Sequence, residues 1–363
     1  MRRNSFLQLT TAAFFIAILA STALGDCVDS SKFFRTELVT YFETYFELPA
    51  EENLTGEWDC DIQLAQGGRR FCRVRLRGVL HYPAVAFKDP TKFPAIILNH
   101  GSEEEFDAWT KGCAVANYFV PKGYIVFVPF RRGQGDITND ARSTGIYIED
   151  MLDDFENRRL LHNTNCADRG CYKAELLKVQ AEVDLVRAFN WLTARANVKK
   201  DRAGEPLLAF MGSSYGGAVT VLVNQLSLGH KAAVPIAPAA QNWGNVNFAY
   251  AATNWSDAGG MTALQEELLQ AAQNAKSPAF YIQAKWDYDT RATIDLAYAH
   301  AYGGSDPKHG KHFMASIFPY DKPGPDPNDP TQLDYDSVHT AFAGRTDLWG
   351  AAVLDFFKRN GVK

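Results

Sequence analysis

The amino-acid sequence predicts an α/β protein in which helices cover both faces of a mostly parallel β-sheet. Three observations lead to this fold class. Short apolar segments recur without polar alternation, which is typical of strands buried on both faces. Segments with apolar residues at helical spacing separate them, as connections between parallel strands require. No internal repeat or linker divides residues 26–363, so a single domain is expected.

The predicted strands begin at one edge of the sheet. Residues 26–55 are mixed, helix-like and polar. Residues 58–82 alternate around Gly67-Gly68 and predict an antiparallel hairpin at that edge. The buried strands that follow are almost wholly apolar, and we place them at 93–98, 123–128, 206–211, 232–237, 279–284 and 312–318.

The predicted helices lie between these strands. Residues 176–192 carry Leu176, Val179, Val183 and Val186 at helical spacing, which indicates one buried face. Further helices are expected at 218–228, 292–301 and 348–359. Two segments interrupt the alternation. The first, residues 319–335, is a Pro/Asp-rich loop. The second, residues 241–277, is an insertion that contains Trp243, Phe248, Tyr250 and Trp255. This insertion is either a small cap over a pocket or purely structural.

The N-terminus reads as a secretory signal peptide over residues 1–25. Arg2 and Arg3 precede an apolar run at 12–20. Ala23 and Gly25 are small residues at the third and the first position before the expected cleavage site. The apolar run is shorter than the ~20 residues that span a bilayer. We therefore expect cleavage after Gly25 and a secreted or periplasmic protein without a membrane span.

Composition and charge narrow the function classes. Hydrophobic residues make up 46% and charged residues 22% of the chain, which excludes disordered and fibrous proteins. The net charge is −5, so the chain has no overall positive field for a phosphate backbone, and we expect no nucleic-acid partner. The oligomeric state is left open.

The six cysteines all lie in the expected mature chain, an even number that suits disulfides outside the cytosol. Cys166 and Cys171 flank a short polar loop, and Cys60 and Cys72 flank the Gly67-Gly68 turn. The remaining pair would be Cys27 with Cys113, but six cysteines allow about fifteen pairings, so the connectivity stays open. The sequence contains no paired Cys-x-x-Cys spacing, the pattern that would indicate a zinc site.

The strongest functional signal is Gly212-Ser213-Ser214-Tyr215-Gly216-Gly217 between a predicted strand and a predicted helix. A Gly-x-Ser-x-Gly in this setting forms a turn so sharp that the central serine is exposed in a strained conformation. The following helix directs its first amides toward the serine oxygen. Ser214 is therefore the predicted nucleophile.

A serine hydroxyl needs a base, and His339 is the best placed of the eight histidines. It lies in a predicted loop between the last strand and the last helix, at the sheet edge where reactive groups gather in this architecture. His309 and His312 have a metal-like spacing, but no acid or thiol lies near them in the sequence, so we expect no metal site.

An acid should orient that imidazole, and Asp287 and Asp289 both follow the strand that ends at Ala284. The chain order of serine, acid and histidine is the one this architecture uses. We favour Asp287 because it is nearer the strand end. Asp289 stays open, and either it or Thr290 would otherwise cap the next helix.

The oxyanion of an acyl-transfer reaction needs backbone donors. Asn99-His100-Gly101-Ser102 ends a predicted strand, and the amide of Ser102 or Glu103 would act with that of Tyr215. The run 131–135, Arg-Arg-Gly-Gln-Gly, is expected to be structural rather than catalytic.

Together these motifs resemble the α/β-hydrolase superfamily and, in detail, its dienelactone-hydrolase-related branch. Those that carry the resemblance are the segments 100–101, 130–135, 212–217, 286–288 and 338–342, which occur in the expected order and span roughly residues 60–360. The resemblance implies an eight-stranded, mostly parallel sheet and a triad of Ser214, Asp287 and His339. Dienelactone hydrolases are cytosolic and use a cysteine nucleophile, so a general ester is the expected substrate here.

The expected activity is hydrolysis of a small-molecule or polymer carboxylic ester through an acyl-serine, without a metal or organic cofactor. Trp243 and Trp286 are expected to contact the substrate. A serine peptidase of the prolyl-oligopeptidase type is the main alternative, although no repeat-bearing propeller precedes the domain in this sequence. A non-catalytic binding protein with the same fold is the other, and a missing triad member would mark it.

Overall fold

The computed structural model describes residues 34–48, 70–84, 91–101, 105–131, 169–239, 243, 262–288, 290–303, 313–322, 324–327 and 333–363. The predicted signal peptide, residues 1–25, lies outside these ranges and stays a prediction. No helix within the described part of the chain combines the length and the apolar character needed to cross a membrane.

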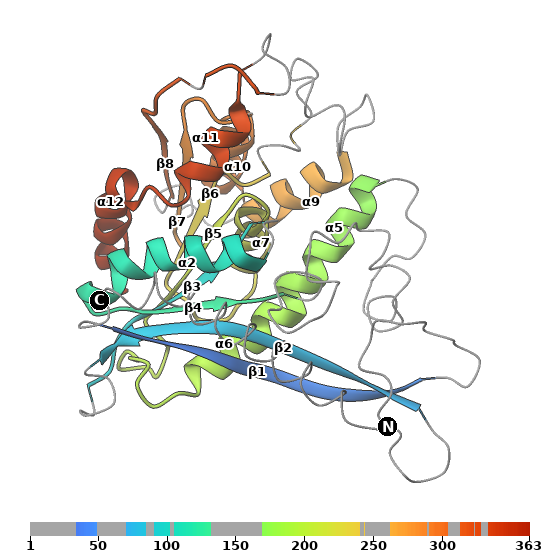
Figure 1. Cartoon of the computed structure of the whole chain (residues 1–363), viewed down its shortest axis with the longest axis vertical. Coiled ribbons are helices and arrows are strands. Elements are labelled where there is room, and N and C mark those ends of the chain that lie inside the picture. The colour runs from blue at the N-terminus through green and yellow to red at the C-terminus, as the bar shows by residue number, and fades with distance from the viewer. Residues whose placement is uncertain are drawn as a thin grey trace, which may run out of the picture.

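Eight strands form one sheet in the order β1-β2-β4-β3-β5-β6-β7-β8 (Figure 1). Strand β2 is antiparallel to both of its neighbours, β1 and β4, and from β4 onward every neighbouring pair is parallel. This confirms the predicted eight-stranded, mostly parallel sheet. The strands are β1 Phe34–Leu48, β2 Arg70–Pro83, β3 Ala95–Asn99, β4 Ile125–Pro129, β5 Leu208–Ser213, β6 Ala232–Ile236, β7 Ala279–Ala284 and β8 Phe313–Phe318.

Helices cover both faces of the sheet, as predicted. One apolar cluster joins Ala95 and Ile97 of β3 to α5, α6, α7, α9 and α10, and a second joins Ile96 and Leu98 to α2, α11 and α12. Successive side chains of a strand point to opposite faces, so β3 supplies both layers. The helical elements are α2 Glu105–Phe119, η2 Val120–Lys122, α5 Arg169–Val179, η3 Gln180–Asp184, α6 Leu185–Thr193, α7 Tyr215–Asn224, α9 Thr262–Gln273, α10 Thr290–Tyr302, α11 Tyr335–Phe342 and α12 Thr346–Arg359.

The first strand differs from the prediction. Residues 26–55 are predicted to be mixed and helix-like, but residues 34–48 form the long edge strand β1, which pairs with β2 along its whole length. An edge strand has one partner and an exposed side, so it keeps polar residues, and these weaken the alternation of apolar and polar residues by which a strand is recognised. The partner of β2 is therefore β1, whereas the predicted first arm of the hairpin, near Cys60, lies outside the described residues.

The predicted insertion at 241–277 is partly a core element. Helix α9 lies within it, and Leu264 and Leu268 of α9 are buried in the same cluster as α7 and α10. Trp243 is also buried, and its indole Nε1 donates a hydrogen bond of 2.7 Å to Asp295 on α10. Residues 244–261, including Phe248, Tyr250 and Trp255, lie outside the described ranges, so a cap formed by them stays a prediction.

Two cysteines have described side chains. Cys113 on α2 and Cys171 on α5 are both disulfide-bonded. Each predicted pairing, Cys27 with Cys113, Cys60 with Cys72 and Cys166 with Cys171, includes a cysteine outside the described residues, so the connectivity stays a prediction.

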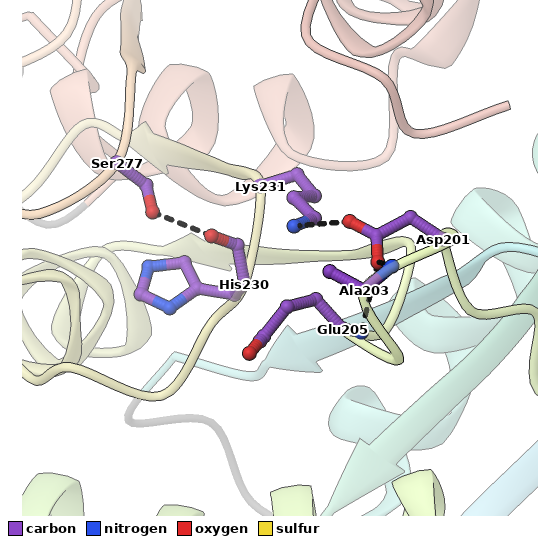
Figure 2. A network of polar contacts seen from close by, with 6 residues as sticks. All are labelled: Asp201, Ala203, Glu205, His230, Lys231 and Ser277. Carbon is purple, nitrogen blue, oxygen red and sulfur yellow. Dashed lines mark hydrogen bonds and ion pairs between the residues drawn. The ribbon is translucent and has the colours of Figure 1, made fainter.

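A polar network joins the loops at the amino ends of β5 and β6, the end of the sheet opposite Ser214 (Figure 2). The Nε2 atom of His230 donates to Asn224 Oδ1 at 2.8 Å, and its carbonyl oxygen accepts from Ser277 Oγ at 2.6 Å. Lys231 forms a 2.9 Å ion pair with Asp201, which also accepts from the amides of Ala203 and Glu205. These contacts hold the His230 ring in a buried position.

Stability is expected to fall as the pH decreases below 6.5. Burial lowers the pKa of His81 to about 3, and burial with the nearby charge of Lys231 lowers that of His230 to about 4, from 6.5. Between pH 6.5 and 4 the unfolded chain therefore takes up protons at both sites while the folded chain takes up almost none. The free energy of unfolding should fall by up to about 1.4 kcal/mol per pH unit for each histidine.

Urea denaturation at pH 7, 6 and 5 measures this slope. A His230→Gln variant is less stable at every pH because it disturbs the network, but its slope should be shallower by the contribution of one proton. A slope equal to that of the wild-type protein would contradict a neutral, buried His230.

Candidate active site

Ser214 lies at the turn between β5 and α7 in a conformation that is rare for a residue with a side chain. Its φ is 56° and its ψ is −119°. Its amide donates to Ile236 O at 2.8 Å, and its carbonyl oxygen accepts from Ala218 N at 3.0 Å, so both sides of the residue are held. A left-handed, non-glycine residue costs about 1–3 kcal/mol and persists only where the surroundings enforce it. This geometry is that of the strained elbow expected from the sequence.

The two glycines that flank the elbow allow the backbone to pack closely. A Cβ atom on Gly216 would collide with the carbonyl oxygens of Asn99 and His100, and one on Gly212 would collide with the carbonyl group of Gly216. The first turn of α7 therefore rests directly on the end of β3. Any larger residue would push the helix, and Ser214 with it, away from the sheet.

A side-chain relay locks this junction. Asn99 Nδ2 donates to Thr220 Oγ1 at 2.9 Å, and Thr220 Oγ1 donates to Gly216 O at 2.8 Å. Asn99 and Thr220 are both fully buried. The sequence interpretation did not single out Thr220, although a threonine one turn into an otherwise apolar helix after the elbow is a signal for such a contact.

Asp287 and His339 form a buried pair on two different segments. Asp287 follows β7, and its Oδ1 accepts from His339 Nδ1 at 2.6 Å and from the amide of Tyr288 at 2.7 Å. The Asp287 side chain is 0% exposed and that of His339 is 7% exposed. A carboxylate only accepts hydrogen bonds, so Nδ1 carries the proton and Nε2 is the basic nitrogen of the ring.

His339 is predicted to lie in a loop, but it lies on the short helix α11. Asp334 caps this helix by accepting from the amide of Ser337 at 2.9 Å. The rings of His339 and Tyr288 also pack in a T-shaped arrangement, with 5.3 Å between the centroids. The cap and the ring contact fix the imidazole against Asp287.

All three predicted triad residues follow the carboxyl ends of parallel strands, Ser214 after β5, Asp287 after β7 and His339 after β8. Backbone hydrogen bonds tie these ends together, because Ser214 N donates to Ile236 O and Ala237 N donates to Ile282 O, each at 2.8 Å. One strand, β6, separates β5 from β7, a spacing of about 10 Å. The three residues therefore belong to the same edge of the sheet.

The structure describes some of the other predicted site residues. Tyr215 is the first residue of α7, so its amide is one of the N–H groups at the N-terminus of that helix. Ser102, Glu103 and Asp289 lie outside the described residues. Trp286 is half-buried, with Nζ of Lys285 and of Lys322 at 5.5 and 5.8 Å from its ring centroid. Contact of Trp243 or Trp286 with substrate stays a prediction.

Within the described part of the chain, no three His, Cys, Asp or Glu side chains gather as a possible set of metal ligands. His309 and His312 lie outside that part. The site as described thus consists of a strained serine, a helix N-terminus and a carboxylate–imidazole pair.

The strand order, the antiparallel β2 and the serine elbow after β5 define the α/β-hydrolase fold. The chain is therefore an α/β-hydrolase-fold protein, which confirms the fold expected from its motifs.

No protein-family model and no curated protein matches the sequence. Among solved structures, it is similar to the acylaminoacyl peptidase of Pyrococcus horikoshii, with 16% identity, a TM-score of 0.48, and coverage of 90% of this chain and 42% of the peptidase. It is also similar to an acetyl xylan esterase from Paenibacillus sp. R4, with 13% identity, a TM-score of 0.47, and coverage of 94% and 93%.

A third similar structure is Est1E from Butyrivibrio proteoclasticus with ferulic acid bound, with 13% identity, a TM-score of 0.47, and coverage of 85% of this chain and 100% of Est1E. The chain thus spans less than half the length of the peptidase and more than nine-tenths of the length of the other two proteins. At these identities the similarity concerns the fold.

Proposed function

We propose that this protein is a serine hydrolase that cleaves carboxylic esters through an acyl-serine intermediate. The observation that carries the proposal is the strained conformation of Ser214 after β5, at the same sheet edge as the buried Asp287–His339 pair. Strain of this kind needs a reason to persist, and presenting a nucleophile supplies one.

The reaction follows from the roles of these groups. His339 Nε2 takes the proton from Ser214 Oγ as that oxygen attacks the ester carbonyl carbon. The charge that develops on the carbonyl oxygen is held by the amide of Tyr215 and by an amide of the loop after β3. The C–O bond then breaks, the alcohol leaves with the proton from His339, and water releases the acid by the same steps in reverse.

Esters are favoured over peptides on chemical grounds. An alkoxide or phenoxide leaves more easily than an amide nitrogen, so an ester makes the smallest demand on the acid His339. Aryl esters of increasing acyl length, compared with peptide anilides of matched acyl groups, separate the two activities. Turnover of the anilides at rates equal to the esters would favour the peptidase.

Covalent labelling tests the nucleophile. A fluorophosphonate should react once per chain, and peptide mapping should place the phosphonyl group on Ser214 because His339 activates that hydroxyl alone. Ser214→Ala should abolish labelling. Ser213→Ala is the matched control, since it changes the neighbouring serine and should be labelled like the wild-type protein. Attachment at any other residue, or no attachment, would overturn the proposal.

A further inference from the structure

Arg131 is a buried cation that the reaction described above does not use. It follows β4 and, at 1% exposure, is among the largest fully buried side chains of the described residues. A guanidinium group is strongly disfavoured in the interior unless its charge and its N–H groups are compensated. The groups that surround Arg131 therefore indicate why it is there.

The first of these groups are the carbonyl oxygens at the end of β3. Arg131 Nη2 donates to His100 O at 2.7 Å and approaches Gly101 O at 3.3 Å. His100 Nδ1 also donates to Gly101 O at 2.9 Å. These two carbonyl groups directly precede Ser102 and Glu103, one of which is predicted to supply an oxyanion amide.

The second group is the ring of Tyr215. The Cζ atom of Arg131 lies 5.5 Å from the Tyr215 ring centroid, within the range of a cation–π contact. Tyr215 is 8% exposed, and its amide is the other predicted oxyanion donor. One guanidinium group thus contacts the residues on both sides of the predicted oxyanion hole.

Two further buried polar residues act on Tyr215 from η3, a π-helical turn between α5 and α6. Gln180 and Asp184 on this turn are both fully buried. Burial raises the pKa of Tyr215, while the charge of Arg131 and the Gln180 side chain lower it and the charge of Asp184 raises it further. Arg131 and Asp184 thus have opposite effects on the pKa of Tyr215, and Asp184 Oδ1 itself lies 4.0 Å from Nη1 of Arg187. A π-helical turn often marks a functional position in a helix.

We propose that Arg131 is a positioning residue that holds the two arms of the oxyanion hole in a fixed relation, through its hydrogen bonds to His100 O and Gly101 O and its contact with the Tyr215 ring. The proposal rests on the proposed serine hydrolase function. Oxyanion donors contribute most when they are fixed before the reaction, because no reorganisation is then needed as charge develops. Arg131 also places a positive charge beside the Tyr215 ring and the carbonyl groups at the end of β3.

Kinetics on an aryl ester test this role. Arg131→Met should lower kcat by about 10- to 100-fold and change KM by less than about threefold, because the donors act mainly on the transition state. Arg131→Lys keeps the charge and one donor, so it should recover part of the lost kcat. Arg195→Met is the matched control, since Arg195 follows the end of α6, is half-buried over the Trp191 ring and should leave kcat unchanged.

A boronic acid separates positioning from a general loss of structure. Phenylboronic acid adds to the serine as a tetrahedral anion that resembles the transition state. Its Ki should rise in Arg131→Met by the same factor by which kcat/KM falls. A loss of kcat with an unchanged Ki would overturn the proposal, and so would wild-type values of both.

Hydrogen exchange makes the test independent of activity. In Arg131→Met, the peptides that cover residues 99–105 and 212–218 should exchange at least about tenfold faster than in the wild-type and Arg195→Met proteins, with other core peptides unchanged. If the wild-type protein is inactive and is not labelled by the fluorophosphonate, the proposed function fails, and exchange alone decides whether Arg131 holds the two segments. Unchanged exchange in both peptides would overturn the positioning role.

Discussion

Replacing Ser214 with alanine is expected to lower kcat on an aryl ester by about 10⁴-fold or more, because no second nucleophile is proposed at this site. The remaining donors still bind the ester and polarise it, so a small rate above the uncatalysed reaction should persist. Steady-state kinetics with p-nitrophenyl acetate, at enzyme concentrations high enough to detect the residual rate, measure the effect.

Substitutions of Ser214 also measure the backbone strain at the elbow. Alanine keeps the Cβ atom and with it the left-handed strain at φ 56°, whereas glycine removes both. Ser214→Gly should therefore be about as inactive as Ser214→Ala but more stable than it by about 1 kcal/mol in urea denaturation. Retention of more than a few per cent of kcat in either variant would exclude Ser214 as the nucleophile.

Asp287→Asn is expected to lower kcat by about 10⁴-fold while leaving the fold intact. Asp287 Oδ1 accepts the Nδ1 proton of His339 at 2.6 Å, which leaves Nε2 as the basic ring nitrogen for the proposed proton transfer. An asparagine can donate from its amide to Nδ1 instead, and the proton then resides on Nε2, where it blocks proton transfer from Ser214. KM should change little, because Asp287 is buried behind the histidine.

The matched control for this change is Asp201→Asn. Asp201 also accepts hydrogen bonds through its carboxylate, but it lies at the opposite end of the sheet in the network around His230 (Figure 2). It should lose some stability and keep the wild-type kcat. Asp287→Asn with kcat within tenfold of the wild-type protein would contradict the role of Asp287, and Asp289 would then be the residue to exchange.

The features that could be predicted from the sequence are those with a local pattern. The strands at 93–98, 206–211 and 279–284 agree with β3, β5 and β7 to within two residues, because strands buried on both faces must be apolar throughout. The elbow at Ser214 was equally local, since its glycines, its strand and its helix are contiguous in the chain.

The edge of the sheet and the helix that carries His339 were harder to predict. Strand β1 pairs on one side only, so its pattern is diluted by exposed polar residues. Helix α11 is eight residues long and follows a proline-rich loop, so its apolar positions are too few for a clear helical period. Its cap, Asp334, becomes recognisable only once the Ser337 amide is seen to bond to it.

The sequence by itself determined the class of sheet, the serine elbow and the short list of acids and histidines that could serve it. The tertiary structure alone decided which of them meet, because Asp287 and His339 are 52 residues apart, Asn99 and Thr220 are 121 apart, and Arg131 is 31 residues from His100. A hydrogen bond depends on positions in space to within a few tenths of an ångström. Separation along the chain carries no such information until the strands have paired and brought their ends to one edge.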